Sequence, residues 1–228
     1  SLLPTFFYAE SGKEFYINQY VGSHYDGRDM KFDIEGNYPA DGNITINFRQ
    51  GTDKELNLRI PAWCKNPAAR LNGKNISGIE PGSYLKINRR WTKGDCLELS
   101  FPMEERWIMR EHHADYEKYY LKDGEIMYRE KPTQNIPCAF LRGPVVYCVD
   151  MVWNPQLHNN DCDILKDMRF DISSLPASIG KVDPTMMAGC FKAKGTYKGN
   201  PVDLILTPFA NVGQWWRNGE AKPQPWAD

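Results

Sequence analysis

The sequence predicts an all-β protein of two β-sandwich-like units, preceded by a short helical stub at the N-terminus. Short segments in which apolar and polar residues alternate recur about every 8–12 residues, which is typical of sandwiches and barrels. Clusters of Gly, Asn, Asp and Pro separate these segments and indicate turns. The 3.6-residue period of an amphipathic helix is outnumbered by this alternation.

The composition indicates a folded chain and gives no sign of a polyanionic partner such as nucleic acid or anionic lipid. The chain has 228 residues, of which 41% are hydrophobic, and this content excludes an intrinsically disordered class. A net charge of −1 provides no general attraction to nucleic acid or to anionic lipid. No apolar run approaches the roughly 18 residues of a membrane-spanning helix. We therefore expect neither nucleic acid nor a membrane as a partner.

Three segments are expected along the chain. Residues 1–12 begin with the apolar stretch Leu2–Ala9 and stop at Gly12, which predicts the last turns of a helix. Residues 13–152 form the first β-sandwich. Between residues 151 and 163 the composition turns to Asn, Asp, Pro and His, and this shift predicts a boundary before a smaller β-sandwich-like unit over residues 153–228.

The strands expected in the first sandwich share aromatic or β-branched content or a period of two. Asn72-Gly73 lies between two short extended flanks and is the strongest hairpin signal in the chain. Pro61 ends the strand before it, because proline donates no ladder hydrogen bond. The expected strands span residues 14–21, 30–34, 44–48, 56–60, 84–88 and 96–101.

The rest of the chain is less regular but still reads as β-structure. In the charged segment 104–131, Asp123-Gly124 favours a hairpin, although the propensities of residues 106–120 also allow a helix. Val145–Val149 is apolar on both faces, which predicts a central strand. Further short strands are expected over residues 168–172, 190–197 and 202–209.

Alternation also predicts a core. Residues at every second position of an expected strand share one face, so they should be buried together. The residues selected in this way are Leu58, Ile60, Leu85, Ile87, Leu97, Leu99, Val146 and Cys148.

The cysteines and histidines do not form a metal-binding pattern. No CxxC pair occurs, and His112-His113 are neighbours that point to opposite faces of a strand. We therefore expect no metal and no cofactor in this chain. The cysteines are interpreted mostly as small buried apolar residues, namely Cys64, Cys96, Cys138, Cys148, Cys162 and Cys190.

Motifs for covalent catalysis are also missing from the sequence. There is no GxSxG element and no glycine-rich phosphate loop. The acidic residues Glu104, Glu105, Glu111 and Asp115 are available for a carboxylate pair, but the sequence places no two of them at a catalytic distance. The aromatic residues that would stack on a sugar ring are Trp215, Trp216 and Trp226.

Several segments together resemble glycoside hydrolase family 127 (GH127), the β-L-arabinofuranosidase type. They include Leu58–Trp63, Gly82–Ile87, Leu97–Met103 and Arg142–Cys148. Leu71–Lys74, Trp91, Gly94-Asp95 and Leu206–Gly213 continue the similarity in the same order, so the resemblance spans nearly the whole chain.

The resemblance implies the C-terminal β-sandwich region of such an enzyme. The family's catalytic glutamates, and a zinc held by cysteines and a glutamate, belong to an upstream (α/α)6 barrel, and no cysteine of this chain occupies those ligand positions. No catalytic residue is therefore carried over. The expected role is to pack against and shape that barrel, with Phe6, Phe7 and Tyr8 at the interface and a plant-type oligosaccharide as a partner of the parent enzyme.

Two other functions remain open on the sequence. The first is a carbohydrate-binding module that uses the exposed Trp and Tyr side chains. The second is a small self-contained glycosidase. The compartment is periplasmic or extracellular if the parent chain carries a signal peptide, and otherwise cytoplasmic.

Overall fold

The computed structural model describes residues 6–109, 114–120, 126–132, 137–157, 167–212, 216–217 and 220–221. Their regular elements are strands, together with short 3₁₀ segments at Met151–Trp153 and Phe209–Asn211. The all-β prediction is thus confirmed. Contacts divide the chain into a first unit, Ser1–Glu104 with Arg142–Val145, and a second unit, Glu105–Leu141 with Val146–Asp228.

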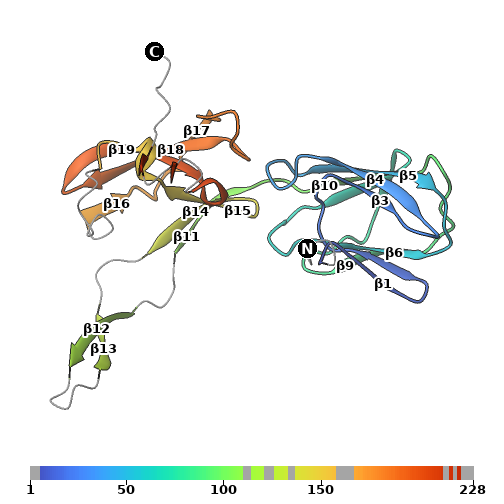
Figure 1. The fold of residues 1–228 in the computed structure, drawn as a ribbon, viewed down its shortest axis with the longest axis horizontal. Helices are drawn as coiled ribbons and strands as arrows, with labels where there is room; N and C mark the ends of the chain where they lie inside the picture. Colours follow the sequence, from blue (N-terminus) through green and yellow to red (C-terminus); the bar gives the residue numbers. More distant parts are fainter. Residues whose placement is uncertain are drawn as a thin grey trace. The chain divides into compact units, whose positions relative to one another are not determined.

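The first unit is a sandwich of two sheets, which form two layers in Figure 1. One sheet has the order β1-β2-β6-β9 and the other β3-β4-β5-β10-β7-β8. The four strands of the first sheet are β1 (Tyr8–Ser11), β2 (Glu14–Ile17), β6 (Glu55–Arg59) and β9 (Tyr84–Ile87). The six strands of the second are β3 (Ser23–Asp26), β4 (Lys31–Gly36), β5 (Asn43–Gln50), β10 (Cys96–Ser100), β7 (Ala68–Leu71) and β8 (Lys74–Ile76).

The core of this unit lies between the inward faces of the two sheets. The alternation in β2 and β6 buries Phe15, Ile17, Leu56 and Leu58 against residues of β4, β5 and β10. Of the predicted core residues, the structure buries Leu58, Ile60, Leu85, Leu97 and Leu99, while Ile87 is half-buried and packs against the same cluster.

The Asn72-Gly73 turn forms as predicted. It joins β7 and β8, and both residues have positive φ, 51° at Asn72 and 77° at Gly73. Positive φ at both central positions is the requirement of a type I′ turn, whose twist matches that of the flanking strands. The dipeptide therefore fixes this hairpin locally.

The helical stub is not confirmed, and most of its described part belongs to a β-hairpin. Tyr8–Ser11 form β1, which pairs antiparallel with β2 through a tight turn at Gly12, where φ is 59°. The ladder and the packing of the Tyr8 ring on Phe15 stabilise this hairpin over a helical turn, and the ring centroids lie 6.0 Å apart. Residues 1–5 of the expected stub lie outside the described residues.

The second unit is built on one sheet with the order β11-β14-β15-β19-β18-β16, and β17 pairs with β18. Strands β12 and β13 form the hairpin that Asp123-Gly124 predicts, although the turn itself lies outside the described ranges. The bounds are β11 (Glu105–Met109), β12 (Ala114–Tyr120), β13 (Ile126–Pro132), β14 (Cys138–Arg142), β15 (Val145–Val149), β16 (Met168–Phe170), β17 (Ala177–Gly180), β18 (Cys190–Tyr197), β19 (Asn200–Pro208), β20 (Trp216–Arg217) and β21 (Glu220–Ala221).

Strand β15 is an interior strand, as predicted, but the predicted inward face is wrong. Val146 is 43% exposed and Cys148 is half-buried, whereas Val145 and Tyr147 are buried. Because apolar residues occupy both faces of this strand, alternation does not tell which face meets the core. The Tyr147 ring packs instead on Phe191, with centroids 5.0 Å apart.

The division between the units falls near residue 104, whereas the sequence predicts a boundary at residue 152. Strands β11, β14 and β15 join the same sheet as β18 and β19. Long-range pairing such as Tyr147 with Pro208 thus ties the middle of the chain to its end. A shift in composition does not reveal such pairing.

Candidate functional site

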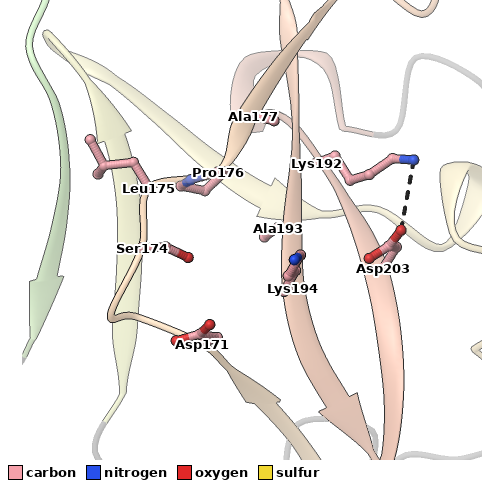
Figure 2. Close-up of a pocket in the computed structure, with 9 residues that line it drawn as sticks. All are labelled: Asp171, Ser174, Leu175, Pro176, Ala177, Lys192, Ala193, Lys194 and Asp203. Atoms are coloured by element: carbon pink, nitrogen blue, oxygen red, sulfur yellow. Dashed lines mark ion pairs between the residues drawn. The ribbon is translucent and has the colours of Figure 1, made fainter.

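A surface hollow of about 270 Å³ lies in the second unit. Figure 2 shows its lining, which comes from the loop before β17 and from the neighbouring strands β18 and β19. Lys192 and Lys194 are exposed because they alternate with the buried Ala193 along β18. The lining residues are Asp171, Ser174, Leu175, Pro176, Ala177, Lys192, Ala193, Lys194 and Asp203.

The charged groups of this hollow offset one another. Lys192 Nζ lies 3.7 Å from Asp203 Oδ2, and the pair is drawn as a dashed line in Figure 2. The backbone N–H and the hydroxyl of Ser173 donate to Asp171 Oδ1 at 3.0 and 2.5 Å. These hydrogen bonds, with the charge of Lys194, lower the pKa of Asp171. The carboxylate is therefore ionised at neutral pH and does not serve as a proton donor.

Two further carboxyls of the first unit have a lowered pKa. Hydrogen bonds from His24 and Arg49 lower the pKa of Asp33. Burial alone would raise the pKa of Asp95, but hydrogen bonds from Asn72 and Thr92 lower it. The general acid of a glycosidase needs a raised pKa. These shifts run in the opposite direction and are those of structural carboxylates.

The four candidate catalytic carboxylates are described only in part. Glu104 Oε2 lies 2.9 Å from Lys65 Nζ in the first unit, and Glu105 begins β11 in the second. Glu111 lies outside the described residues, as does the side chain of Asp115. The structure therefore does not bring these residues together as a catalytic pair within the part of the chain that it describes.

The described cysteines are free thiols. Cys64 and Cys190 are buried, whereas Cys96, Cys138 and Cys148 are half-buried. In all five, burial is the largest cause of a raised pKa, which keeps the thiol protonated. The interpretation as buried small residues holds for Cys64 and Cys190, and Cys162 lies outside the described ranges.

Two kinds of feature are absent from the described residues. They contain no group of three or more His, Cys, Asp or Glu side chains that could hold a metal ion. They also contain no helix that is long and apolar enough to cross a membrane. His112, His113 and His158 lie outside these ranges, so the interpretation of the His112-His113 pair stays a prediction.

The predicted interface residues differ in exposure. The Phe6 side chain is 67% exposed, while Phe7 and Tyr8 are half-buried. Tyr8 packs against the core, with its ring 5.2 Å from that of Tyr25 and its hydroxyl 2.7 Å from Ser23 Oγ. Phe6 is thus the most accessible of the three.

The side chains of the three predicted sugar-binding tryptophans lie outside the described part of the chain. Trp215 and Trp226 are outside the described residues, and Trp216 is described only as part of β20, without its side chain. Their role stays a prediction.

An aromatic pair that the sequence does not single out lies on the outward face of the four-stranded sheet. Tyr16 in β2 and Tyr84 in β9 contact each other edge to face, with ring centroids 5.4 Å apart. The usable signal was the alternation around Tyr16, because Phe15 and Ile17 face the core and Tyr16 must face outward. The pairing of the two tyrosines depends on sheet topology and has no local signal.

Comparison with known protein families gives one match, which lies within the first unit. Residues 14–103 match the family model described as the middle domain of GH127 β-L-arabinofuranosidase. This range begins at the first residue of β2 and ends just after β10, so it covers nearly the whole sandwich of the first unit. No curated protein matches the sequence.

Solved structures share the fold over most of the chain. A glycoside hydrolase aligns with a TM-score of 0.59 and 20% identity over 92% of this chain and 35% of its own. A GH127 β-L-arabinofuranosidase from Geobacillus stearothermophilus T6 aligns with a TM-score of 0.55 and 21% identity, covering 92% and 33% of the two chains. A GH127 β-arabinofuranosidase aligns with a TM-score of 0.57 and 21% identity, over 96% of this chain and 35% of its own. The chain thus spans about a third of the length of each.

Proposed function

We propose that the chain is a non-catalytic β-sandwich part of a carbohydrate-degrading glycoside hydrolase, on the basis that residues 14–103 match the family model of the GH127 middle domain. Its role is to pack against the catalytic (α/α)6 barrel of a longer parent protein and to shape that barrel. The observation that carries the proposal is the family match, together with a fold shared over nearly the whole chain but only about a third of each similar structure.

The chemistry of the described residues supports a structural role. The perturbed carboxyls are held ionised by hydrogen bonds within turns and strands, as Asp95 is by Asn72. In the hollow, Lys192 Nζ lies 3.7 Å from Asp203 Oδ2 and forms an ion pair with it. Polar groups that stabilise loops in this way are not available for acid–base chemistry on a substrate.

The substrate belongs to the parent enzyme in this proposal. Two of the similar structures are described as β-arabinofuranosidases, one of them as a β-L-arabinofuranosidase. We therefore propose arabinofuranosides, in oligosaccharides of the plant type, as the class that the parent degrades. No cofactor of this chain takes part, and the metal and the catalytic glutamates belong to the barrel.

The proposed barrel contact includes Phe6. An aromatic side chain that is 67% exposed at the edge of the first sandwich gains apolar burial when another domain covers it. Phe209 is a matched control, because it is 63% exposed and belongs to the second unit. The test is calorimetric titration of the barrel part of the parent enzyme with this chain and with two variants.

The expected result is binding by the chain and by Phe209→Ser, and weaker binding by Phe6→Ser. Loss of barrel binding in Phe209→Ser alone would show that the contact involves the second unit and not Phe6. Absence of any association between the chain and the barrel would contradict the proposed packing.

A further inference from the structure

The outward face of the four-stranded sheet places aromatic rings beside amide groups. In the ladder, Tyr16 pairs with Asn57 across β2 and β6, and Asn57 pairs with Lys86 across β6 and β9. Directly opposed residues of neighbouring strands lie on one face, so these three side chains form a row. Tyr84, which is 40% exposed, lies on the same face and contacts Tyr16.

Both tyrosine rings are fixed through their hydroxyl groups. Tyr16 donates to Glu14 Oε2 at 2.8 Å, and Tyr84 donates to Asn18 Oδ1 at 2.7 Å. The hydrogen bond to Glu14 is the largest cause of the raised pKa of Tyr16, so this hydroxyl keeps its proton. Rings held in one orientation lose little entropy when a ligand binds to them.

Asn57 is the unusual member of this face. Its side chain is fully buried at 0% exposure, yet neither its amide nitrogen nor its amide oxygen has a hydrogen-bond partner among the described residues. Leaving buried polar groups unpaired is unfavourable, because their hydrogen bonds to water are lost without replacement. The residue opposite in the ladder is Lys86, an exposed side chain on a flexible stem, and a ligand reaches the Asn57 amide only if the side chains around it move. The amide then offers one donor and one acceptor to an incoming ligand.

We propose that this tyrosine face, formed by Tyr16, Asn57 and Tyr84 with Asn18 at its rim, binds a neutral oligosaccharide. A sugar ring stacks on the exposed part of Tyr84, and two neighbouring hydroxyl groups of the sugar pair with the Asn57 amide. Glu14 and Lys86 on the same face have opposite charges, so the face does not favour an anionic ligand.

The tyrosine face suits a sugar better than the hollow of the second unit does. No aromatic side chain lines that hollow, and its Lys192 is paired with Asp203. Of these two surfaces, only the tyrosine face offers both an aromatic ring for stacking and an amide without a hydrogen-bond partner. The choice of an arabinose-containing glycan as ligand rests on the proposed function.

The test uses the whole 228-residue chain and short linear arabino-oligosaccharides, titrated by isothermal calorimetry. We expect measurable binding, and a loss of affinity of about tenfold or more in Tyr84→Ala and in Asn57→Leu, a factor that corresponds to about 1.4 kcal/mol. Asn57→Leu is informative because an apolar residue of similar shape removes the unpaired amide without destabilising the sheet. Its melting temperature should equal or exceed that of the wild type.

The matched controls are Phe209→Ala, an exposed aromatic residue of the second unit, and Lys192→Ala in the hollow. Both should bind as the wild type does. No binding of the oligosaccharides, or unchanged affinity in both Tyr84→Ala and Asn57→Leu, would overturn the inference. So would binding of the parent barrel that Tyr84→Ala abolishes, since the face would then be a protein interface. The oligosaccharide titrations are independent of whether the chain hydrolyses a glycoside or associates with the barrel, so they can fail while the proposed function stands.

Discussion

The Asn72 amide nitrogen donates a hydrogen bond to Asp95 Oδ1 at 2.7 Å. The oxygen of the same amide accepts from the backbone N–H of Cys96 at 2.8 Å, so one side chain in the type I′ turn holds the start of β10. Asp95 is buried, and its second carboxylate oxygen accepts from the backbone N–H of Thr92 at 2.7 Å. The two residues together join the β7–β8 turn to the turn that precedes β10.

This pair predicts a pH-dependent loss of stability. Because the folded-state pKa of Asp95 is lowered, its contribution is present above the unfolded-state value of about 3.9 and is lost as the pH falls through the folded-state pKa. We expect Asp95→Ala to lower the free energy of unfolding by about 1–3 kcal/mol at pH 7. The difference from the wild type should shrink below about pH 4, as measured by urea unfolding at several pH values.

Asp53 is the matched control for Asp95. Its pair with Arg90 is highly exposed, so Asp53→Ala should change stability by less than about 1 kcal/mol at every pH. A pH-independent loss in Asp95→Ala would show that the carboxylate acts through packing alone.

Gly42 has no room for a side chain. A Cβ atom there would lie 1.8 Å from the carbonyl oxygen of Phe101, whose N–H donates to the Gly42 carbonyl at 2.9 Å. Gly42→Ala must therefore displace backbone, and it should cost about 1–3 kcal/mol or more. At Gly22 the nearest atom would lie 3.6 Å away, so Gly22→Ala should be neutral or stabilise by about 0.4–1 kcal/mol. Thermal unfolding of both variants checks this contrast, and equal melting temperatures would contradict it.

Leu99 and Val146 test the corrected core. Leu99 is 2% exposed between the two sheets, and Leu99→Ala should cost about 2–5 kcal/mol. Val146 is 43% exposed, so Val146→Ala should change stability by no more than about 0.5 kcal/mol. Urea unfolding measures the free energy of unfolding of both variants. A larger loss for Val146→Ala than for Leu99→Ala would show that Val146 faces the core, as the sequence predicts.

The sequence predicts that the chain holds no structural metal. Dialysis against a chelator should then leave the melting temperature unchanged, because a structural zinc site would contribute to folding free energy. The measurement covers the whole chain, including Cys162, His112 and His113, which the structure does not describe. Stoichiometric zinc in the purified protein, together with a lower melting temperature after chelation, would contradict the prediction.

Local signals predicted most of the first unit. The Asn72-Gly73 turn requires positive φ at two positions, and alternation at Leu97 and Leu99 requires one buried face, so both follow from the sequence. Where local pattern is ambiguous, prediction failed. Val146 lies in a strand that is apolar on both faces, and Tyr8 lies in a short apolar run that takes its strand form from pairing with Ile17.

The candidate sites were less predictable for a related reason. Tyr16 and Tyr84 meet only because β2, β6 and β9 are neighbours in one sheet, and Asn57 stands out only once its burial is known. The resemblance to GH127 depended on the order of many weak motifs, which is information that no single residue carries. It indicated the family but carried over no site residue.

The measurement that tests the central proposal most directly is hydrolysis of an aryl β-L-arabinofuranoside by the purified 228-residue chain. A non-catalytic part of a glycoside hydrolase should give no turnover above the buffer blank, while the parent enzyme that contains the barrel hydrolyses the same substrate. Turnover by the chain alone that disappears when one of its own Glu or Asp residues is replaced would contradict the account and establish a self-contained glycosidase.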